Sequence, residues 1–168
     1  MGGKRAGKRN QGAESEEMVS VCRNRKASYE YTLSDQNECG MVLVGSEVKS
    51  LRENPPSMDQ AFARIESGEA WLYGLDIPEY VKANQLNHKP KRKRKLLLHK
   101  DEISKLATKT AQKGCTLIPL EIYFKKGKAK IILAVGIGKK LHDKRESIKK
   151  SEANREIHRE ISRRRRRA

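Results

Sequence analysis

Two apolar runs joined by a short basic turn decide the fold of this chain: Thr116-Leu-Ile-Pro-Leu-Glu-Ile-Tyr-Phe-Lys-Lys-Gly-Lys-Ala-Lys-Ile-Ile-Leu-Ala-Val-Gly-Ile137. The turn at Lys125–Lys128 is short enough for Thr116–Phe124 and Lys128–Ile137 to pair as neighbouring strands. Along the second run, apolar side chains at alternate positions form an inward set, Ile131, Leu133, Val135 and Ile137. We therefore predict two paired strands that share one face of a hydrophobic core.

The segment before these strands predicts a helix from Asp101 to Lys113. Its buried stripe recurs at helical spacing and consists of Ile103, Leu106, Ala107, Thr110 and Ala111. Asp101 and Glu102 favour the positive amino end of this helix, and Gly114 can adopt the left-handed conformation that ends it. No other segment before the tail has so clear a helical period.

Alternating residues predict more strands in the first half of the chain. Ser28–Leu33 is expected to be a half-buried strand, and Gly40–Leu51 a longer one in which Gly45 marks a bulge or a close backbone approach. On that longer strand Glu47 and Lys49 would share one face. They would form either a polar binding surface or an ion pair on the solvent side.

A hairpin is predicted to follow, after a short helical turn over Met58–Ala61. Its strands are Ala63–Ile65 and Glu69–Ile77, and Ser67-Gly68 is a typical two-residue turn between them. Trp71, Tyr73 and Leu75 would lie on one face of the second strand. That face is either a platform for stacked bases or part of the core, and the core is the favoured interpretation.

These elements predict a mostly β protein, a small closed barrel of the oligonucleotide-binding type with about six strands, flanking helices and a basic C-terminal tail. Periodicity alone does not separate this barrel from an SH3-like one. Residues 1–20 lack large apolar side chains and are expected to be disordered. We expect the barrel domain to occupy residues 21–137 and the tail residues 138–168.

The charge of the chain indicates a polyanionic partner. Its net charge is +17, and residues 139–168 alone carry 13 basic and 5 acidic side chains. Nucleic acid is favoured over a membrane surface, because no strongly apolar helix face accompanies the charge. We also see no apolar run of transmembrane length and no signal peptide, and these observations predict a cytoplasmic protein.

The sequence predicts neither an enzyme nor a metal or cofactor site. The 3 cysteines are far apart and fit free thiols in a reducing compartment, and the 4 histidines are isolated from one another. His142, Asp143 and Lys144 are adjacent, but a basic tail offers no rigid scaffold to orient catalytic groups.

Two basic segments are candidates for contact with nucleic acid. Lys89–Lys95 has six basic residues in seven, and the apolar residues after it, Leu96–Leu98, should hold its end in place. The tail after Gly138 pairs Glu with Lys or Arg at helical spacing but has few apolar residues. We therefore expect it to be unfolded when free and helical when bound.

Four motifs occur in the order and spacing of a known family: Asn24-Arg-Lys-Ala27, Gly45-Ser-Glu-Val-Lys-Ser-Leu-Arg52, Asn87-His-Lys-Pro-Lys-Arg-Lys-Arg-Lys-Leu-Leu-Leu-His99, and Gly138-Lys-Lys-Leu-His-Asp-Lys-Arg-Glu-Ser-Ile-Lys149. The chain thus resembles the SmpB family of SsrA-binding proteins. That resemblance implies an RNA-binding adaptor of trans-translation, with no catalysis and no cofactor. It would bind the tRNA-like part of transfer-messenger RNA 1:1 and bring it to stalled ribosomes, where the tail would occupy the decoding site and the empty mRNA channel.

The resemblance also assigns candidate residues. Those for RNA are Asn24, Glu38 and Leu96 by matching position, Glu47 and Lys49 from the family's most characteristic strand, and Arg94 and Lys95 from the basic loop. Those of the ribosome-directed tail are Gly138, Lys139, Lys140, His142, Asp143, Lys144, Arg145, Ile148 and Lys149. Glu38 could accept hydrogen bonds from RNA or simply pair with a local arginine. The alternative function is a general coating protein of structured RNA or of the ribosome, without a role in rescue.

Overall fold

The computed structural model describes residues 18–83 and 87–140, together with Asp143, Glu152, Arg159 and Ile161. In chain order its elements are β1 (Met18–Arg23), α1 (Ala27–Glu30), β2 (Tyr31–Met41), α2 (Gly45–Glu53), β3 (Phe62–Glu66), β4 (Glu69–Tyr73), the 3-10 turn η1 (Val81–Ala83), β5 (Arg94–Leu97), α3 (Lys100–Thr110), β6 (Cys115–Lys125) and β7 (Lys128–Gly138). No helix in this described part is long and apolar enough to cross a membrane.

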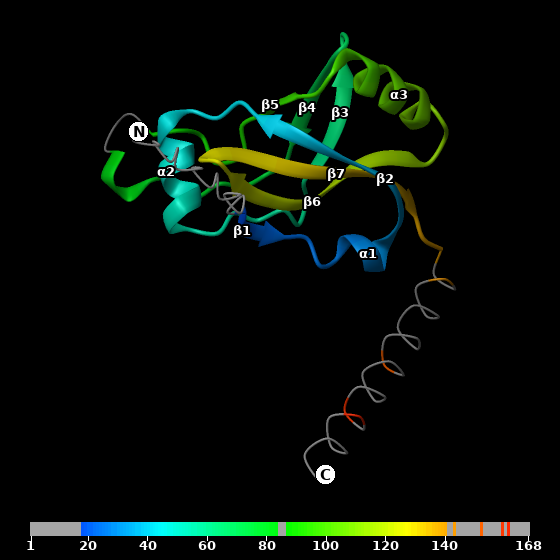
Figure 1. Cartoon of the computed structure of the whole chain (residues 1–168), viewed down its shortest axis with the longest axis horizontal. Coiled ribbons are helices and arrows are strands. Elements are labelled where there is room, and N and C mark those ends of the chain that lie inside the picture. The colour runs from blue at the N-terminus through cyan, green and yellow to red at the C-terminus, as the bar shows by residue number, and fades with distance from the viewer. Residues whose placement is uncertain are drawn as a thin grey trace, which may run out of the picture.

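Six strands close into a ring, which confirms the predicted barrel with flanking helices. The strand order is β6-β3-β4-β5-β2-β7, and β7 pairs again with β6. The seam between β3 and β6 is a single pairing, Ala63 with Leu117, whereas β6 and β7 pair along almost their whole length. β1 adds to the outer edge of β6, and Figure 1 shows α2 and α3 at opposite ends of the barrel.

The paired strands predicted at Thr116–Ile137 are confirmed and form the central part of this core. Ile131 and Leu133 have no exposed surface, and Val135 is almost as deeply buried. Ile137 departs from the prediction, because half of its surface is exposed where β7 leaves the barrel. The turn at Lys126 and Gly127 has positive φ at both residues, which is the conformation that closes two-residue hairpins.

The predicted long strand Gly40–Leu51 is wrong. β2 ends at Met41, and the helix α2 begins at Gly45. Alternation over these residues suits a strand, yet the buried residues Glu47, Ser50 and Leu51 follow helical spacing. Nothing lies within 4 Å of the position of a Cβ at Gly45, so this glycine marks neither a bulge nor a close approach.

The start of the predicted strand Ser28–Leu33 is also helical, because α1 occupies Ala27–Glu30 before β2 begins at Tyr31. The amide of Ala27, the first residue of α1, donates to Asn24 Oδ1 at 3.1 Å, which ties the start of this helix to the segment before it. At Met58–Ala61 the chain makes a single turn, closed by the Ala61 amide and the Met58 carbonyl, instead of the short helical turn expected there.

The hairpin of β3 and β4 is confirmed, with Ser67 and Gly68 at its turn, but the face assigned to the core is not. Ala70 and Leu72 are fully buried, so Trp71 and Tyr73 lie on the outer face of β4. Leu75 is nevertheless buried, because Gly74, with φ +70°, interrupts the alternation between them. The core interpretation was therefore wrong for both aromatic residues.

The helix α3 confirms the main helical prediction with shorter bounds. It starts at Lys100, where the amide of His99 donates to Glu102 Oε2 at 2.9 Å, and ends at Thr110. Leu106 is its buried residue, while Ala111 is exposed beyond its last turn. Gly114 has φ +89°, the left-handed conformation expected after a helix.

Candidate nucleic-acid interface

A buried ion cluster attaches the basic loop to α2. The Glu47 carboxylate has no exposed surface and accepts from Arg92 Nε at 2.8 Å and from Arg94 Nε at 2.9 Å. A second Arg92 nitrogen, Nη2, lies 2.5 Å from Glu47 Oε2, which also accepts from the amide of Val44 at 2.9 Å. This is the bidentate geometry in which arginine binds carboxylates most strongly.

The cluster is satisfied on its cationic side as well. Arg94 is fully buried and donates to the carbonyl oxygens of Leu75 at 2.5 Å, Pro90 at 2.8 Å and Arg92 at 3.1 Å. Burial opposes ionisation of Glu47, yet its bonds from Arg92 and the Val44 amide and the nearby charge of Arg94 keep its pKa below the ordinary value. Burial lowers the pKa of Arg94, with the Glu47 charge opposing that shift.

Residues just before the loop fix its entry. The Asn87 side chain donates to the Tyr80 carbonyl at 3.0 Å and accepts from the Tyr80 amide at 3.1 Å. His88 is buried, with Nδ1 3.0 Å from Ser46 Oγ and Nε2 3.2 Å from the Ile77 carbonyl. The side chains at 88, 92 and 94 thus face the protein, while the lysines between them are exposed: Lys89, Lys91 and Lys93.

The predicted RNA-binding residues separate into two groups by burial. Glu47, Arg94 and Leu96 have at most 2% of their surface exposed. In this conformation these three side chains face the interior of the protein, and their assignment to RNA binding stays a prediction. Lys49 is exposed and lies over the Tyr80 ring at 5.8 Å. Two residues apart on a helix point in nearly opposite directions, so Glu47 and Lys49 do not share a face as expected.

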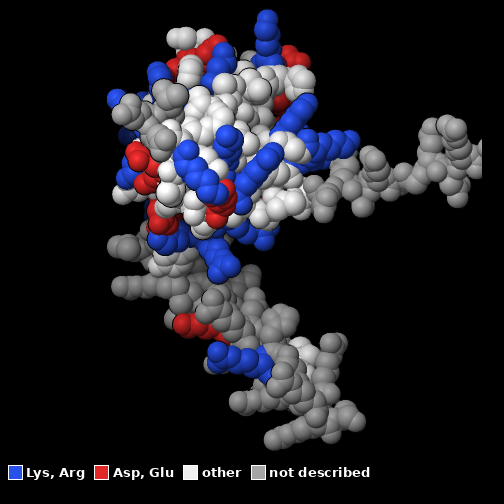
Figure 2. Space-filling model, turned by 90° about the vertical axis from the view of Figure 1, so that its left-hand side faces the viewer, with Lys and Arg blue, Asp and Glu red and all other residues white. Residues whose placement is uncertain are grey.

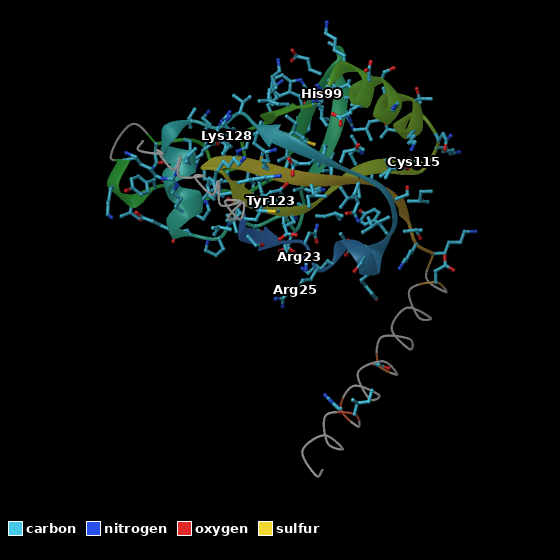
Figure 3. All side chains as sticks on the ribbon, viewed as in Figure 1. Arg23, Arg25, His99, Cys115, Tyr123 and Lys128 are labelled. Carbon is cyan, nitrogen blue, oxygen red and sulfur yellow. The ribbon has the colours of Figure 1, made fainter. Side chains whose placement is uncertain are left out.

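A second cluster contains the predicted residue Glu38. Its two carboxylate oxygens accept hydrogen bonds from Tyr123 Oη and Lys130 Nζ, which hold the pKa of Glu38 below its ordinary value. Burial, followed by the bond to Glu38, raises the pKa of Tyr123, which Figure 3 labels. Of the two roles considered for Glu38, the structure shows local pairing, although the partner is Lys130 and not an arginine.

Glu38 lies in a hollow of about 670 Å³ that also brings together the predicted residues Lys95 and Leu96. Pairing of β2 with β5 places these segments side by side, with Met41 opposite Leu96. Lys95 Nζ is 2.5 Å from Glu69 Oε1, so the rim of the hollow carries two lysine–carboxylate pairs. Its walls can offer both hydrogen-bond donors and acceptors to the edges and riboses of an RNA.

Asn24 lies in a separate hollow of about 430 Å³, which Arg23 and Arg25 also line. Its side-chain nitrogen donates to the Pro119 carbonyl at 3.2 Å, and its side-chain oxygen accepts from the amide of Ala27 at the start of α1. Asn24 therefore holds the backbone in place, and the two arginines labelled in Figure 3 supply the charge. This hollow has no residue in common with the one around Glu38.

The root of the tail is tied to α1. Gly138 is paired with Tyr31, and Lys139 donates through its amide to the Glu30 carbonyl at 2.9 Å and through Nζ to the Ser28 carbonyl at 2.8 Å. The Lys140 amide donates to Asp143 Oδ2 at 3.3 Å. The other predicted tail residues lie outside the described residues: His142, Lys144, Arg145, Ile148 and Lys149.

The resulting surface can bind phosphates at several places. Figure 2 shows lysine and arginine side chains projecting from the end of the molecule that bears α2, with smaller groups of carboxylates among them. Such charges attract a nucleic-acid backbone without reading its sequence. Within residues 18–83 and 87–140 no three His, Cys, Asp or Glu side chains come together as metal ligands.

Sequence reasoning did not find the partners that complete these clusters, Arg92 and Tyr123. The alternation of Lys89–Lys95 contained a usable signal, because an ordered loop can turn every second basic side chain inward toward a carboxylate. Glu47 three residues after Val44 was a second signal, since a glutamate at that position commonly caps the start of a helix. A strand assignment for Gly40–Leu51 concealed it.

Comparisons with known proteins agree over most of the chain. A family model described as the SmpB protein matches residues 21–163. The SsrA-binding protein of Desulforudis audaxviator is 53% identical over 138 residues, covering 82% of this chain and 90% of that protein. The SsrA-binding protein of Syntrophobacter fumaroxidans is 48% identical over 157 residues, covering 94% and 98%. A solved structure described as "tmRNA-SmpB: a journey to the center of the bacterial ribosome" contains a chain with a TM-score of 0.63 and 46% identity, covering 73% of this chain and 87% of that one.

Proposed function

This chain belongs to the SmpB family, and we propose that it is the RNA-binding adaptor of trans-translation. It binds transfer-messenger RNA (SsrA) and acts with it at stalled ribosomes. The observation that carries this function is the match of 82% to 94% of the chain to SsrA-binding proteins at about half identity. The charge distribution supports it, because a net charge of +17 favours a large RNA partner.

Two parts of the protein would have separate tasks in this function. The barrel, with its hollows around Glu38 and Asn24, would hold the tRNA-like part of the RNA in a 1:1 complex. The tail from Gly138 onward would enter the decoding site and the empty mRNA channel as a helix. Anchoring of Lys139 to the carbonyls of α1 supports this division, because it gives the tail a fixed point of departure from the barrel.

The same proposal includes a cytoplasmic location and the absence of catalysis. The segment 1–20 was predicted to be disordered, but its last residues, from Met18 to Ser20, belong to β1, and the others lie outside the described residues. An adaptor acts by binding and placing an RNA, so it requires no group that transfers protons or attacks a bond. The ion clusters described above fit that role, since their carboxylates are occupied by lysine, arginine, tyrosine and backbone partners.

The test compares the full chain with a version that ends at Lys140, which keeps the anchor of Lys139. Both are titrated with transfer-messenger RNA and with an ordinary tRNA at matched salt, and both are assayed for peptide tagging on ribosomes stalled at the end of an mRNA. We expect the short version to retain tight, selective RNA binding and to lose tagging. Thermal unfolding of both versions checks that the barrel is intact.

The coating alternative predicts a different outcome. If both versions bind all RNAs alike, with only a steep dependence on salt, the protein is a general RNA-coating protein. If the short version tags stalled ribosomes as well as the full chain does, the task assigned to the tail is refuted. Cleavage of the RNA by the protein during either assay would refute the absence of catalysis.

A further inference from the structure

The outer face of β3, β4 and β5 carries aromatic residues that the proposed function does not use, with cationic side chains beside them. We propose that this surface is a second RNA site, which binds unpaired nucleotides by stacking their bases on Trp71 and on the Phe62–Tyr73 pair. It rests on the proposed function only in taking RNA as its ligand. We call it the outer platform, formed by Phe62, Arg64, Trp71, Tyr73, Lys93 and Lys95.

Strand register brings these side chains to one face. Phe62 is directly opposite Tyr73, Arg64 is opposite Trp71, and Trp71 is opposite Lys95 on the other side. The residues between them, Ala63, Ala70 and Leu72, point into the core. Figure 1 shows the three strands side by side next to α3. Pairing of β4 with both β3 and β5 makes the outer platform continuous across them.

The aromatic rings already use the geometry that bases require. The Phe62 and Tyr73 rings are stacked, with centroids 5.5 Å apart and planes at 17°, and 37% of Phe62 is exposed. Trp71 and Tyr73 are half-buried, so packing holds each ring while part of it faces solvent. Stacking on such rings tolerates any base, because every base has a π face.

Cations surround Trp71 on three sides. Lys93 Nζ lies 4.8 Å from its ring centroid, while Arg64 and Lys95 flank it in register on the neighbouring strands. The Arg64 guanidinium lies 5.9 Å from the centre of the Phe62 ring. A base can replace Lys93 over the indole, and the released ammonium group can then bind the adjoining phosphate. This charge complementarity favours a nucleic acid over an apolar peptide segment.

Two carboxylates at the hairpin end belong to the same face and are both occupied. Glu66 Oε2 accepts from Tyr73 Oη at 2.7 Å, and Glu69 Oε1 is 2.5 Å from Lys95 Nζ. They limit the site to the part of the strands away from the turn. There the outer platform adjoins a hollow of about 440 Å³ between β3 and α3, lined by Phe62, Arg64, Ala107 and Thr110 among others.

The outer platform is also continuous with the basic loop. Lys93 belongs to both, and the Glu47 cluster that fixes Arg92 and Arg94 also fixes the backbone on either side of Lys93. A strand of RNA held by the exposed lysines of the loop would therefore be led directly onto Trp71.

Trp71 is the only tryptophan of the chain, so its fluorescence reports on the site directly. The full chain is titrated with an unpaired oligouridylate and with a duplex RNA that has the same number of phosphates. We expect saturable quenching by the unpaired RNA and little quenching by the duplex. Absence of quenching when binding of the labelled oligouridylate is saturated would overturn the proposal.

Variants separate stacking from charge, with affinity measured by anisotropy of the labelled oligouridylate. Trp71→Leu should weaken binding roughly 5- to 150-fold, the range for loss of one stacked base, whereas Trp71→Phe should retain affinity within about threefold. Lys93→Gln should weaken it, and Lys105→Gln, on an exposed position of α3, is the matched charge control. Equal affinity of the leucine and phenylalanine variants would refute stacking even if one of them is less stable.

Binding of transfer-messenger RNA by the same variants keeps this inference distinct from the proposed function. If the wild-type chain fails to select that RNA, the proposed function fails. If it selects that RNA and Trp71→Leu has no effect on the oligouridylate, only the outer platform is refuted.

Discussion

Replacing Glu47 with glutamine tests whether one buried carboxylate holds the basic loop in place. The substitution keeps the size of the side chain but removes its charge and one of its two acceptor oxygens. Arg94, which is fully buried, and Arg92, whose side chain is 32% exposed, would then face an uncharged group. Removing one partner of a buried ion pair costs about 3–5 kcal/mol, because the other charge stays desolvated.

That cost is a large part of the total, since domains of this size unfold with about 5–15 kcal/mol. Equilibrium unfolding in urea, followed by Trp71 fluorescence, measures it. Glu53→Gln is the matched control, because Glu53 lies on the same helix and its ion pair with Lys82 is 3.6 Å long and largely exposed. An exposed pair contributes at most about 1 kcal/mol. Equal stability of the two variants would refute the structural role given to Glu47.

The dependence on pH gives the same hypothesis a second test. The pKa of Glu47 is lowered in the folded protein, so its contribution is fully present above its unfolded pKa of about 4.3 and is lost as pH falls through the folded value. Wild-type stability should therefore decline below about pH 4 by more than that of Glu47→Gln. Parallel acid profiles of the two proteins would contradict the assigned shift.

Other parts of the structure give three more predictions. Gly74→Ala should destabilise the protein by more than about 1 kcal/mol, because φ is +70° and the new methyl group would meet the Gln60 carbonyl. Gly68 has a similar φ but open space around it, so Gly68→Ala should lower the free energy of unfolding by less in the same urea assay. Simultaneous change of Lys89, Lys91 and Lys93 to glutamine should leave the unfolding midpoint within error. It should also reduce the slope of log affinity for RNA against log salt concentration by about 0.7–0.9 for each phosphate that the protein no longer neutralises. An unchanged slope would place the RNA elsewhere. Burial raises the pKa of the Cys39 thiol to about 12, so iodoacetamide at pH 8 should modify it only after unfolding, as mass spectrometry of the native and denatured chain would show.

The local sequence pattern was sufficient to predict the secondary structure of segments whose apolar residues recur with the period of only one element, a strand or a helix. The strands at Thr116–Ile137 and the helix α3 have apolar residues that suit only one geometry, and their turns carry glycines at positive φ. Together with the charge of the tail and the four motifs, these segments were enough to predict a closed barrel that binds RNA.

Tertiary contacts decided the rest. The residues from Met41 to Leu51 fit a strand as well as a helix, and burial of Glu47 against arginines 45 and 47 residues away selects the helix. The same interaction determines which basic residues of the loop face the protein and which are exposed to solvent. Trp71 lies outside although Leu75, four residues later, is buried. The positive φ of Gly74 breaks the alternation, so that Leu72 before it and Leu75 after it both enter the core. Sequence period determines which side chains share a face, but only the assembled barrel determines which face is desolvated, because desolvation depends on partners that are distant along the chain.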